Sequence, residues 1–166
     1  GINFYFNAVS GFHRDEYLYL AFSDHPAWGY LSTPPFIGVI SFLIEMASNG
    51  SNFWTRFLPA IAGGLSVFII ALIVKEAGGK LFALATASMA FIFSPIYLRV
   101  NSLLQPVSFD VLFWLLSMFL ILRMLHTKDT RLWYPIFITW GVGFLNKYLI
   151  AILIIATLGA LLLSRD

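Results

Sequence analysis

Two adjacent carboxylates, Asp15 and Glu16, open the part of the sequence in which side chains capable of chemistry are most concentrated. An aromatic run follows them, and Asp24 and His25 come next. Neighbouring carboxylates beside apolar residues resist simultaneous ionisation, so one of them could accept a proton during a reaction. The same pair could also be the solvated end of a loop. Asp15 and Glu16 are therefore the first candidate site residues.

Four further charged residues lie at the ends of separate apolar segments, namely Arg56, Arg99, Asp110 and Lys147. Ionisable groups at the edge of a membrane are costly and are by default functional candidates. The competing interpretation is that Arg56 and Arg99 extend toward lipid headgroups. Asp110 could likewise serve only as an anion near the positive end of a helix dipole. Lys147 has apolar residues on both sides and is the strongest of the four candidates.

His25 lies near Asp24 and Glu16 and could belong to a metal site with oxygen and imidazole ligands. One histidine and some carboxylates have no diagnostic ligand spacing, so a divalent metal is not favoured and no cofactor is expected. We place His25 among the substrate-binding candidates. The sequence contains no cysteine, which excludes thiol nucleophiles and Cys-based zinc sites.

The composition is that of a membrane protein. Hydrophobic residues make up 60% of the chain and charged residues only 11%, whereas about a quarter of the residues in soluble domains are charged. The mean hydropathy is +0.85. The net charge of +2 is dispersed, so no nucleic-acid partner is expected.

Several charge-free segments approach the length of about 20 residues that a helix needs to cross a bilayer. They cover residues 57–74, 81–98 and 106–125. Residues 132–164 would form a helix of about 50 Å, which is too long for one crossing. Gly141, Gly143 and the Asn146-Lys147-Tyr148 triplet interrupt this last segment near its middle. We therefore predict a hairpin of two spans with Lys147 at its tip.

The chain is predicted to be a single all-α transmembrane domain, a polytopic helical bundle, over residues 1–166, as part of a longer protein. Residues 1–12 are expected to be the remainder of a preceding span. Residues 13–53 are expected to form an outer loop, in which residues 34–47 make a helix along the membrane interface. Residues 54–166 are expected to contain five transmembrane helices.

The basic residues indicate an orientation. With alternating sides, four basic residues accompany five acidic ones on one side, which is therefore expected to be extracytoplasmic. The other side is expected to be cytoplasmic and carries six basic residues: Lys75, Lys80, Arg123, Lys128, Arg131 and Arg165.

Several motifs occur together in order along the chain: HRDEYLY at 13–19, HPAWGY at 25–30, Pro34-Pro35, RFLP at 56–59, Phe109-Asp110, and GFLNKY at 143–148. Together they resemble the bacterial family 39-like glycosyltransferases, relatives of the protein O-mannosyltransferases and of the lipid A aminoarabinose transferases. The similarity covers nearly the whole chain.

This resemblance implies a GT-C fold and a polyprenyl-phosphate-linked sugar as donor, with a hydroxyl acceptor on a lipid, glycan or protein. It also implies a multi-pass protein of the plasma (inner) membrane with an extracytoplasmic active site and a role in the cell envelope. Asp15 corresponds to the general base. Sugar transfer from a phosphate also needs cations to stabilise the leaving group, and Lys147 and Arg56 could supply them. The substrate-binding candidates are Glu16, His25, Arg56, Asp110 and Lys147.

Two departures from the aminoarabinose branch point to another branch with an unassigned sugar and acceptor. Ser32 and Thr33 replace its acid-Lys pair, and Leu18 lies where it has a basic residue. Two alternative functions are a secondary transporter that uses Asp15, Glu16, Asp110 and Lys147 as coupling or relay groups, and a non-catalytic membrane scaffold. A transporter would be expected to show charges at mid-membrane and an inverted repeat, and neither is evident.

Overall fold

The computed structural model describes residues 13–31, 33–48 and 51–164. In this part of the chain every regular element is helical, which confirms the predicted all-α class. The predicted stub at residues 1–12 lies outside the described residues. The elements in chain order are α2 (Arg14–Asp24), α3 (Phe36–Ser48), α4 (Asn52–Glu76), α5 (Leu81–Ile92), α6 (Pro95–Val100), α7 (Pro106–Thr127), the short 3₁₀ helix η1 (Thr130–Leu132), α8 (Trp133–Asn146) and α9 (Ile150–Leu163).

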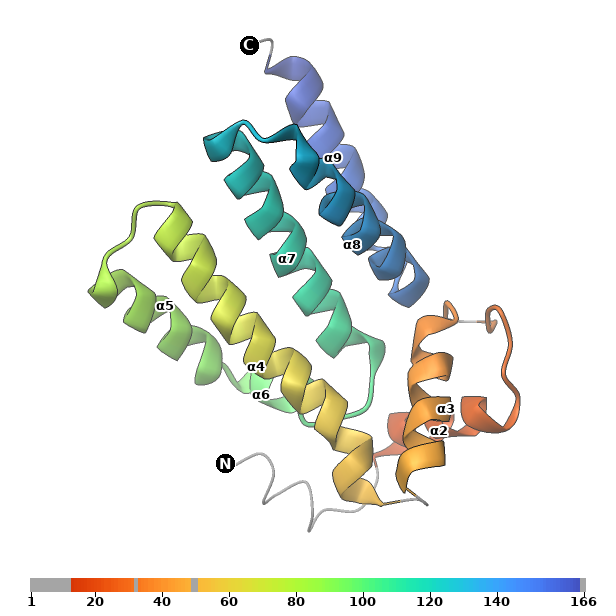
Figure 1. The fold of residues 1–166 in the computed structure, drawn as a ribbon. Helices are drawn as coiled ribbons and strands as arrows, with labels where there is room; N and C mark the ends of the chain where they lie inside the picture. Colours follow the sequence, from red (N-terminus) through yellow and green to blue (C-terminus); the bar gives the residue numbers. More distant parts are fainter. Residues whose placement is uncertain (1–12, 32, 49–50, 165–166) are drawn as a thin grey trace.

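The long helices form a row in the order α5, α4, α7, α8 and α9, as Figure 1 shows. α4 lies between α5 and α7, α7 packs on α8, and α8 packs on α9. α2 and α3 pack on each other beside the beginning of α4. α4 and α7 are each long and apolar enough to cross a bilayer, whereas α3, α5 and α9 are shorter apolar helices. The five crossings remain a prediction.

The turns divide the bundle into two ends (Figure 1). The α4–α5 and α7–α8 turns lie at one end, which we call the Arg131 end. α2, the beginning of α4, the α6–α7 connection and the α8–α9 turn lie at the other, which we call the Asp15 end. Lys75, Lys80, Lys128 and Arg131 thus lie opposite Asp15 and Lys147, as the alternation of spans predicts.

Two predicted breaks can be compared directly with the helices. α8 ends at Asn146 and α9 begins at Ile150, which confirms the hairpin with Lys147 in its turn. The expected span over residues 81–98 is instead two helices, because α5 ends before Ser94 and Pro95 begins α6. The helical conformation is disfavoured at a residue that precedes proline.

Buried apolar side chains form two clusters. At the Asp15 end, Ile37, Ala62, Leu104 and Phe109 join α3, α4, the α6–α7 connection and α7. Farther along the bundle, Met124, Ile136, Trp140 and Ile150 join α7, α8 and α9. The first cluster lies directly beneath α2 and supports the helix that carries Asp15 and Glu16.

Candidate active site

Helix α2 places its two adjacent carboxylates in opposite environments. Successive residues of an α-helix point about 100° apart, so one of two neighbours can face the core while the other faces outward. Glu16 is fully buried, whereas the side chain of Asp15 is 45% exposed. The pair therefore consists of one structural and one accessible carboxylate.

Glu16 accepts hydrogen bonds from three separate parts of the chain. Arg56 of α4 donates from Nε to Oε1 at 2.9 Å and from Nη2 to Oε2 at 2.7 Å. The backbone N–H of His13 donates to Oε2 at 2.7 Å, and that of Leu104 donates to Oε1 at 3.2 Å. The carboxylate thus joins the start of α2 to α4 and to the α6–α7 connection.

These hydrogen bonds keep Glu16 ionised. Burial alone would raise its pKa, but the hydrogen bonds from Arg56, His13 and Leu104, together with the positive charge of Arg56, hold the pKa below its ordinary value. Arg56 is itself only 2% exposed. Since a buried charge is tolerated only when it is paired, the Glu16 carboxylate and the Arg56 guanidinium stabilise each other.

The connection between α6 and α7 is held against α4 by its own contacts. Asn101 is buried against Gly63, where an added Cβ would come within 2.7 Å of the Asn101 Cγ. Ser108 Oγ donates to the carbonyl of Val100 at 2.8 Å. This packing fixes the position of the Leu104 N–H, which donates a hydrogen bond to Glu16.

Among the described residues, Asp15 has only weak charged partners. Its carboxylate oxygens lie 3.6 Å from His13 Nδ1 and 3.7 Å from Arg14 Nε, and the Arg14 side chain is 94% exposed. His13 Nδ1 also accepts a hydrogen bond from the Asp15 N–H at 3.3 Å. The carboxylate therefore remains available to accept a proton.

Tyr19 lies one turn after Asp15 on the same face of α2. Burial raises the pKa of Tyr19, and the negative charge of Asp15 adds to this effect. The phenol therefore stays protonated at neutral pH and can donate a hydrogen bond.

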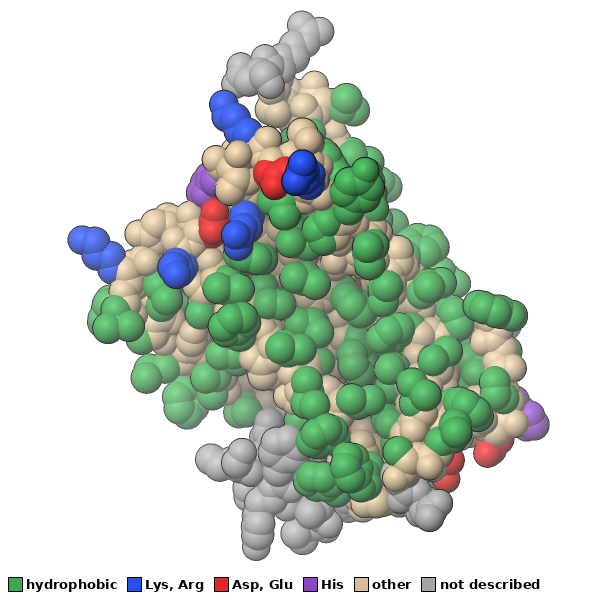
Figure 2. Space-filling model, in the orientation of Figure 1, with side chains coloured by type: hydrophobic (Ala, Val, Ile, Leu, Met, Phe, Trp, Pro, Cys, Tyr) green, Lys and Arg blue, Asp and Glu red, His purple; other side chains and the backbone are tan. Residues whose placement is uncertain are grey.

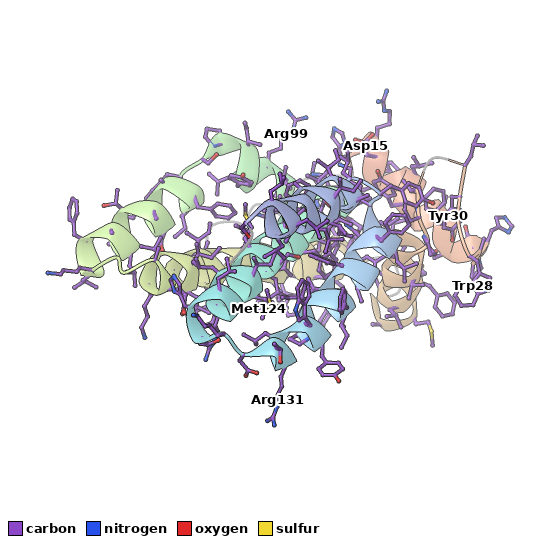
Figure 3. The ribbon with its side chains drawn as sticks, turned by 90° about the horizontal axis from the view of Figure 1, so that it is seen from above. Asp15, Trp28, Tyr30, Arg99, Met124 and Arg131 are labelled. Atoms are coloured by element: carbon purple, nitrogen blue, oxygen red, sulfur yellow. The ribbon has the colours of Figure 1, made fainter. Side chains whose placement is uncertain are left out.

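Figure 3 shows that Asp15 and Arg99 project on the same side of the bundle, away from Arg131.

A second group of polar atoms lies where the end of α8 meets the beginning of α7. Asn146 is fully buried, and its Nδ2 donates to the carbonyl of Pro106 at 3.0 Å. Oδ1 of Asn146 is buried with no hydrogen-bond partner among the described residues. The Asp110 carboxylate interacts with the side chain of Trp114. Lys147 follows Asn146 directly and lies within electrostatic range of Asp110. The group thus places a buried acceptor beside an ammonium.

His25 lies just beyond the far end of α2, about 15 Å along the helix from Asp15. Its side chain is exposed, and its carbonyl accepts from the Tyr30 hydroxyl at 3.2 Å. The Tyr30 ring stacks on Phe22 with centroids 3.8 Å apart, which folds the loop back onto α2. No group of three or more His, Asp and Glu side chains that could hold a metal ion occurs within residues 13–31, 33–48 and 51–164.

The structure thus gathers the predicted site residues at one end of the bundle, but not in a single site. Glu16 and Arg56 form a buried pair, Asp110 and Lys147 belong to the α7–α8 group, and Asp15 and His25 lie at opposite ends of α2. Sequence reasoning missed Asn101, Leu104 and Asn146. Leu104 acts through its main chain, which leaves no signal in the sequence. Asn146 could have been found, because a polar residue beside Lys147 at a helix end is a usable signal.

No curated protein and no solved structure matches the chain. Residues 32–166 match the model of one protein family, described as dolichyl-phosphate-mannose-protein mannosyltransferase. The match includes Arg56, Asp110 and Lys147 and begins after Asp15 and Glu16. Because the matched residues make up most of the chain, the chain belongs to the dolichyl-phosphate-mannose-protein mannosyltransferase family.

Proposed function

We propose that this chain carries the catalytic end of a membrane glycosyltransferase that moves a sugar from a polyprenyl-phosphate donor to a hydroxyl acceptor. Family membership supports a membrane glycosyltransferase of the mannosyltransferase type. The observation that carries the finer proposal is the contrast between Asp15 and Glu16. One carboxylate fastens α2 to the bundle, and the neighbouring one is left accessible with weak partners.

Asp15 is the proposed general base. The acceptor hydroxyl oxygen forms a bond to the anomeric carbon of the sugar, and the bond from that carbon to the phosphate oxygen breaks. Asp15 takes the hydroxyl proton, and the polyprenyl phosphate leaves with the bonding electron pair. A carboxylate suits this role if it is ionised, accessible and held in place. Asp15 has the accessibility, and the Glu16 hydrogen bonds to α4 and to the α6–α7 connection supply the fixed helix.

Lys147 is proposed to stabilise the leaving phosphate. It lies in the α8–α9 turn at the same end of the bundle as α2, and it is partly buried between two apolar helices. An ammonium in such a place is costly unless an anion or water receives it, and the donor phosphate is an anion of this kind. Asp110 lies within electrostatic range of Lys147 and would help to hold this ammonium in place.

Glu16 and Arg56 are proposed to act through the position of α2. Both were expected to bind substrate, but Glu16 is fully buried and Arg56 nearly so. A substrate could reach them only if their mutual hydrogen bonds were broken. Their contribution to catalysis would therefore be the fixed orientation of Asp15. His25 remains a candidate contact for the acceptor, because its side chain is exposed beyond the end of α2.

The donor class can be tested with the full-length protein in liposomes. Polyprenyl-phosphate mannose is supplied with a mixture of hydroxyl acceptors, and the release of polyprenyl phosphate is measured. A parallel reaction receives mannose linked to a nucleoside diphosphate. We expect acceptor-dependent release from the lipid-linked donor alone. Transfer from the nucleotide-linked donor, or release that ignores the acceptor, would contradict the proposal.

A further inference from the structure

A groove lies at the Arg131 end of the bundle, where the chain turns from α7 into α8. It has a volume of about 490 Å³ and is lined by Thr130, Arg131, Trp133, Tyr134 and Phe137. Since α7 is long and apolar enough to cross a bilayer, this turn lies at the level of a membrane–water boundary. The groove is on the opposite end from Asp15 and does not depend on the proposed reaction.

The turn that precedes the groove is built by specific local contacts. α7 ends at Thr127, and the next residue, Lys128, adopts a left-handed conformation with φ 54° and ψ 23°. Asp129 then accepts a hydrogen bond from the Arg131 N–H at 2.9 Å and caps the start of η1. This arrangement turns the Arg131 side chain outward, as Figure 3 shows. The acidic residue beside it is thus bound to the backbone.

The Arg131 guanidinium makes no ion pair within the described part of the chain. Lys128 is exposed three residues earlier. Figure 2 shows Lys and Arg side chains gathered at this end of the molecule, with Asp and Glu side chains among them, beside a broad apolar surface. Within the described residues, the groove therefore has at its polar edge the positive charge of Arg131, which has no ion-pair partner.

The remaining walls of the groove are aromatic. The rings of Trp133 and Phe137 stack with centroids 5.2 Å apart and an angle of 19° between their planes. Tyr134 is 75% exposed and Phe137 is 57% exposed. Aromatic residues at span ends lie at headgroup depth, and a basic residue beside them attracts anionic lipid.

We propose that this groove binds the headgroup of an anionic phospholipid. The phosphate would be held by the Arg131 guanidinium and the Thr130 hydroxyl, and the acyl chains would run along Tyr134 and Phe137. Charge complementarity selects an anionic headgroup. The aromatic walls, which a free phosphate would leave uncovered, select a lipid.

The test uses the full-length protein reconstituted in bilayers that contain equal amounts of phosphatidylglycerol and phosphatidylcholine. Native mass spectrometry then gives the ratio of the two lipids that stay bound. Arg131→Gln is compared with Lys80→Gln, which removes one exposed charge at the same end but outside the groove. Arg131→Lys retains the charge. Thermal unfolding of each variant checks that the fold is unchanged.

We expect the wild-type protein to retain phosphatidylglycerol in preference. Arg131→Gln should lower the ratio about fivefold, while Lys80→Gln should leave it within about twofold and Arg131→Lys should restore most of it. Equal retention of the two lipids by the wild type would overturn the proposal, as would equal losses in Arg131→Gln and Lys80→Gln. A groove covered by another segment of the protein or by a second copy would give the first of these results.

Discussion

At the scale of single residues, the proposed site depends on the difference in burial and pairing between Asp15 and Glu16. Both are carboxylates at the beginning of one helix, yet only Glu16 is buried against a guanidinium. A carboxylate with a lowered pKa and an arginine partner is poorly suited to accept a proton. The base must therefore be the exposed neighbour, and Glu16 is the residue whose loss should affect stability.

The pKa of Glu16 makes a pH-dependent prediction. Because it is lower in the folded protein than its ordinary value of 4.5, the carboxylate contributes stability above that pH and loses it as the pH falls through the folded value. The melting temperature of the wild type should therefore decrease as the pH is lowered from about 4.5. Glu16→Gln should be less stable at pH 7 by about 3 to 5 kcal/mol, since it leaves Arg56 buried without its anion.

Thermal unfolding of both proteins in detergent between pH 3.5 and 7 checks this prediction. The difference in melting temperature between them should shrink toward acid pH. Asp15→Asn serves as the matched control, because its side chain is half-exposed and makes no short hydrogen bond in the described part of the chain. A constant difference across the pH range would show that Glu16 does not stabilise the fold through its charge.

Substitution of Lys147 should weaken binding of the lipid-linked donor. Lys147→Ala removes the proposed contact to the donor phosphate, and hydrogen bonds between charged groups are worth about 1.5 to 3 kcal/mol. The KM for the lipid-linked donor should therefore rise about tenfold or more. Lys147→Arg keeps the charge and should recover part of the loss. A donor KM that is unaffected by Lys147→Ala would place the phosphate elsewhere.

At the scale of elements, the connection between α6 and α7 is the part that supports α2 from below. Gly63 of α4 faces Asn101 of this connection so closely that a Cβ would come within 2.7 Å of the Asn101 Cγ. Gly63→Ala should displace Asn101 and destabilise the protein by about 1 to 3 kcal/mol. Gly64→Ala is the matched control, because nothing lies within 4 Å of its added Cβ.

Gly63→Ala should have both a lower melting temperature and a lower transfer rate than Gly64→Ala. Gly64→Ala should be neutral or slightly stabilising, since alanine is favoured over glycine in helices by up to about 1 kcal/mol. Gly63→Ala should also slow transfer, because Leu104 and Glu16 hold α2. Equal behaviour of the two variants would mean that the connection does not support the site.

Much of the helical arrangement follows from sequence signals that act locally. Pro106 begins α7, and the Asn146-Lys147 pair ends α8, because proline suits a first helical turn and glycines weaken the helix before the turn. Pro95 marks the break at Ser94 in the sequence, but the span over residues 81–98 was predicted from its charge-free length alone. The burial of Glu16 instead of Asp15 depends on the rotation of α2 about its axis. Packing on α4 and on Leu104 sets that rotation, and neither is visible within residues 13–30.

At the scale of the whole molecule, the two ends of the bundle differ in charge. The Lys and Arg count predicts that the Arg131 end is cytoplasmic. The chain has no cysteine, so single-cysteine variants report without background. Asp129→Cys and Tyr148→Cys place the probe at exposed positions in the two opposite turns.

Labelling of intact cells with an impermeant thiol reagent should modify Tyr148→Cys. Asp129→Cys should react only after the membrane is permeabilised. Both variants should react equally in detergent, which controls for exposure. Reaction of Asp129→Cys from outside intact cells would reverse the orientation and would place the proposed active site in the cytoplasm.

The assignment of Asp15 as general base is the central claim, and the rate of sugar transfer by Asp15→Asn tests it most directly. Asp24→Asn is its matched control, because Asp24 is an exposed carboxylate at the other end of the same helix. With saturating polyprenyl-phosphate sugar, Asp15→Asn should lower kcat by about 10²-fold or more, as expected for loss of a general base. Its donor KM and its melting temperature should stay near those of the wild type, and Asp24→Asn should transfer at the wild-type rate. A kcat of Asp15→Asn within about twofold of the wild type would contradict the assignment.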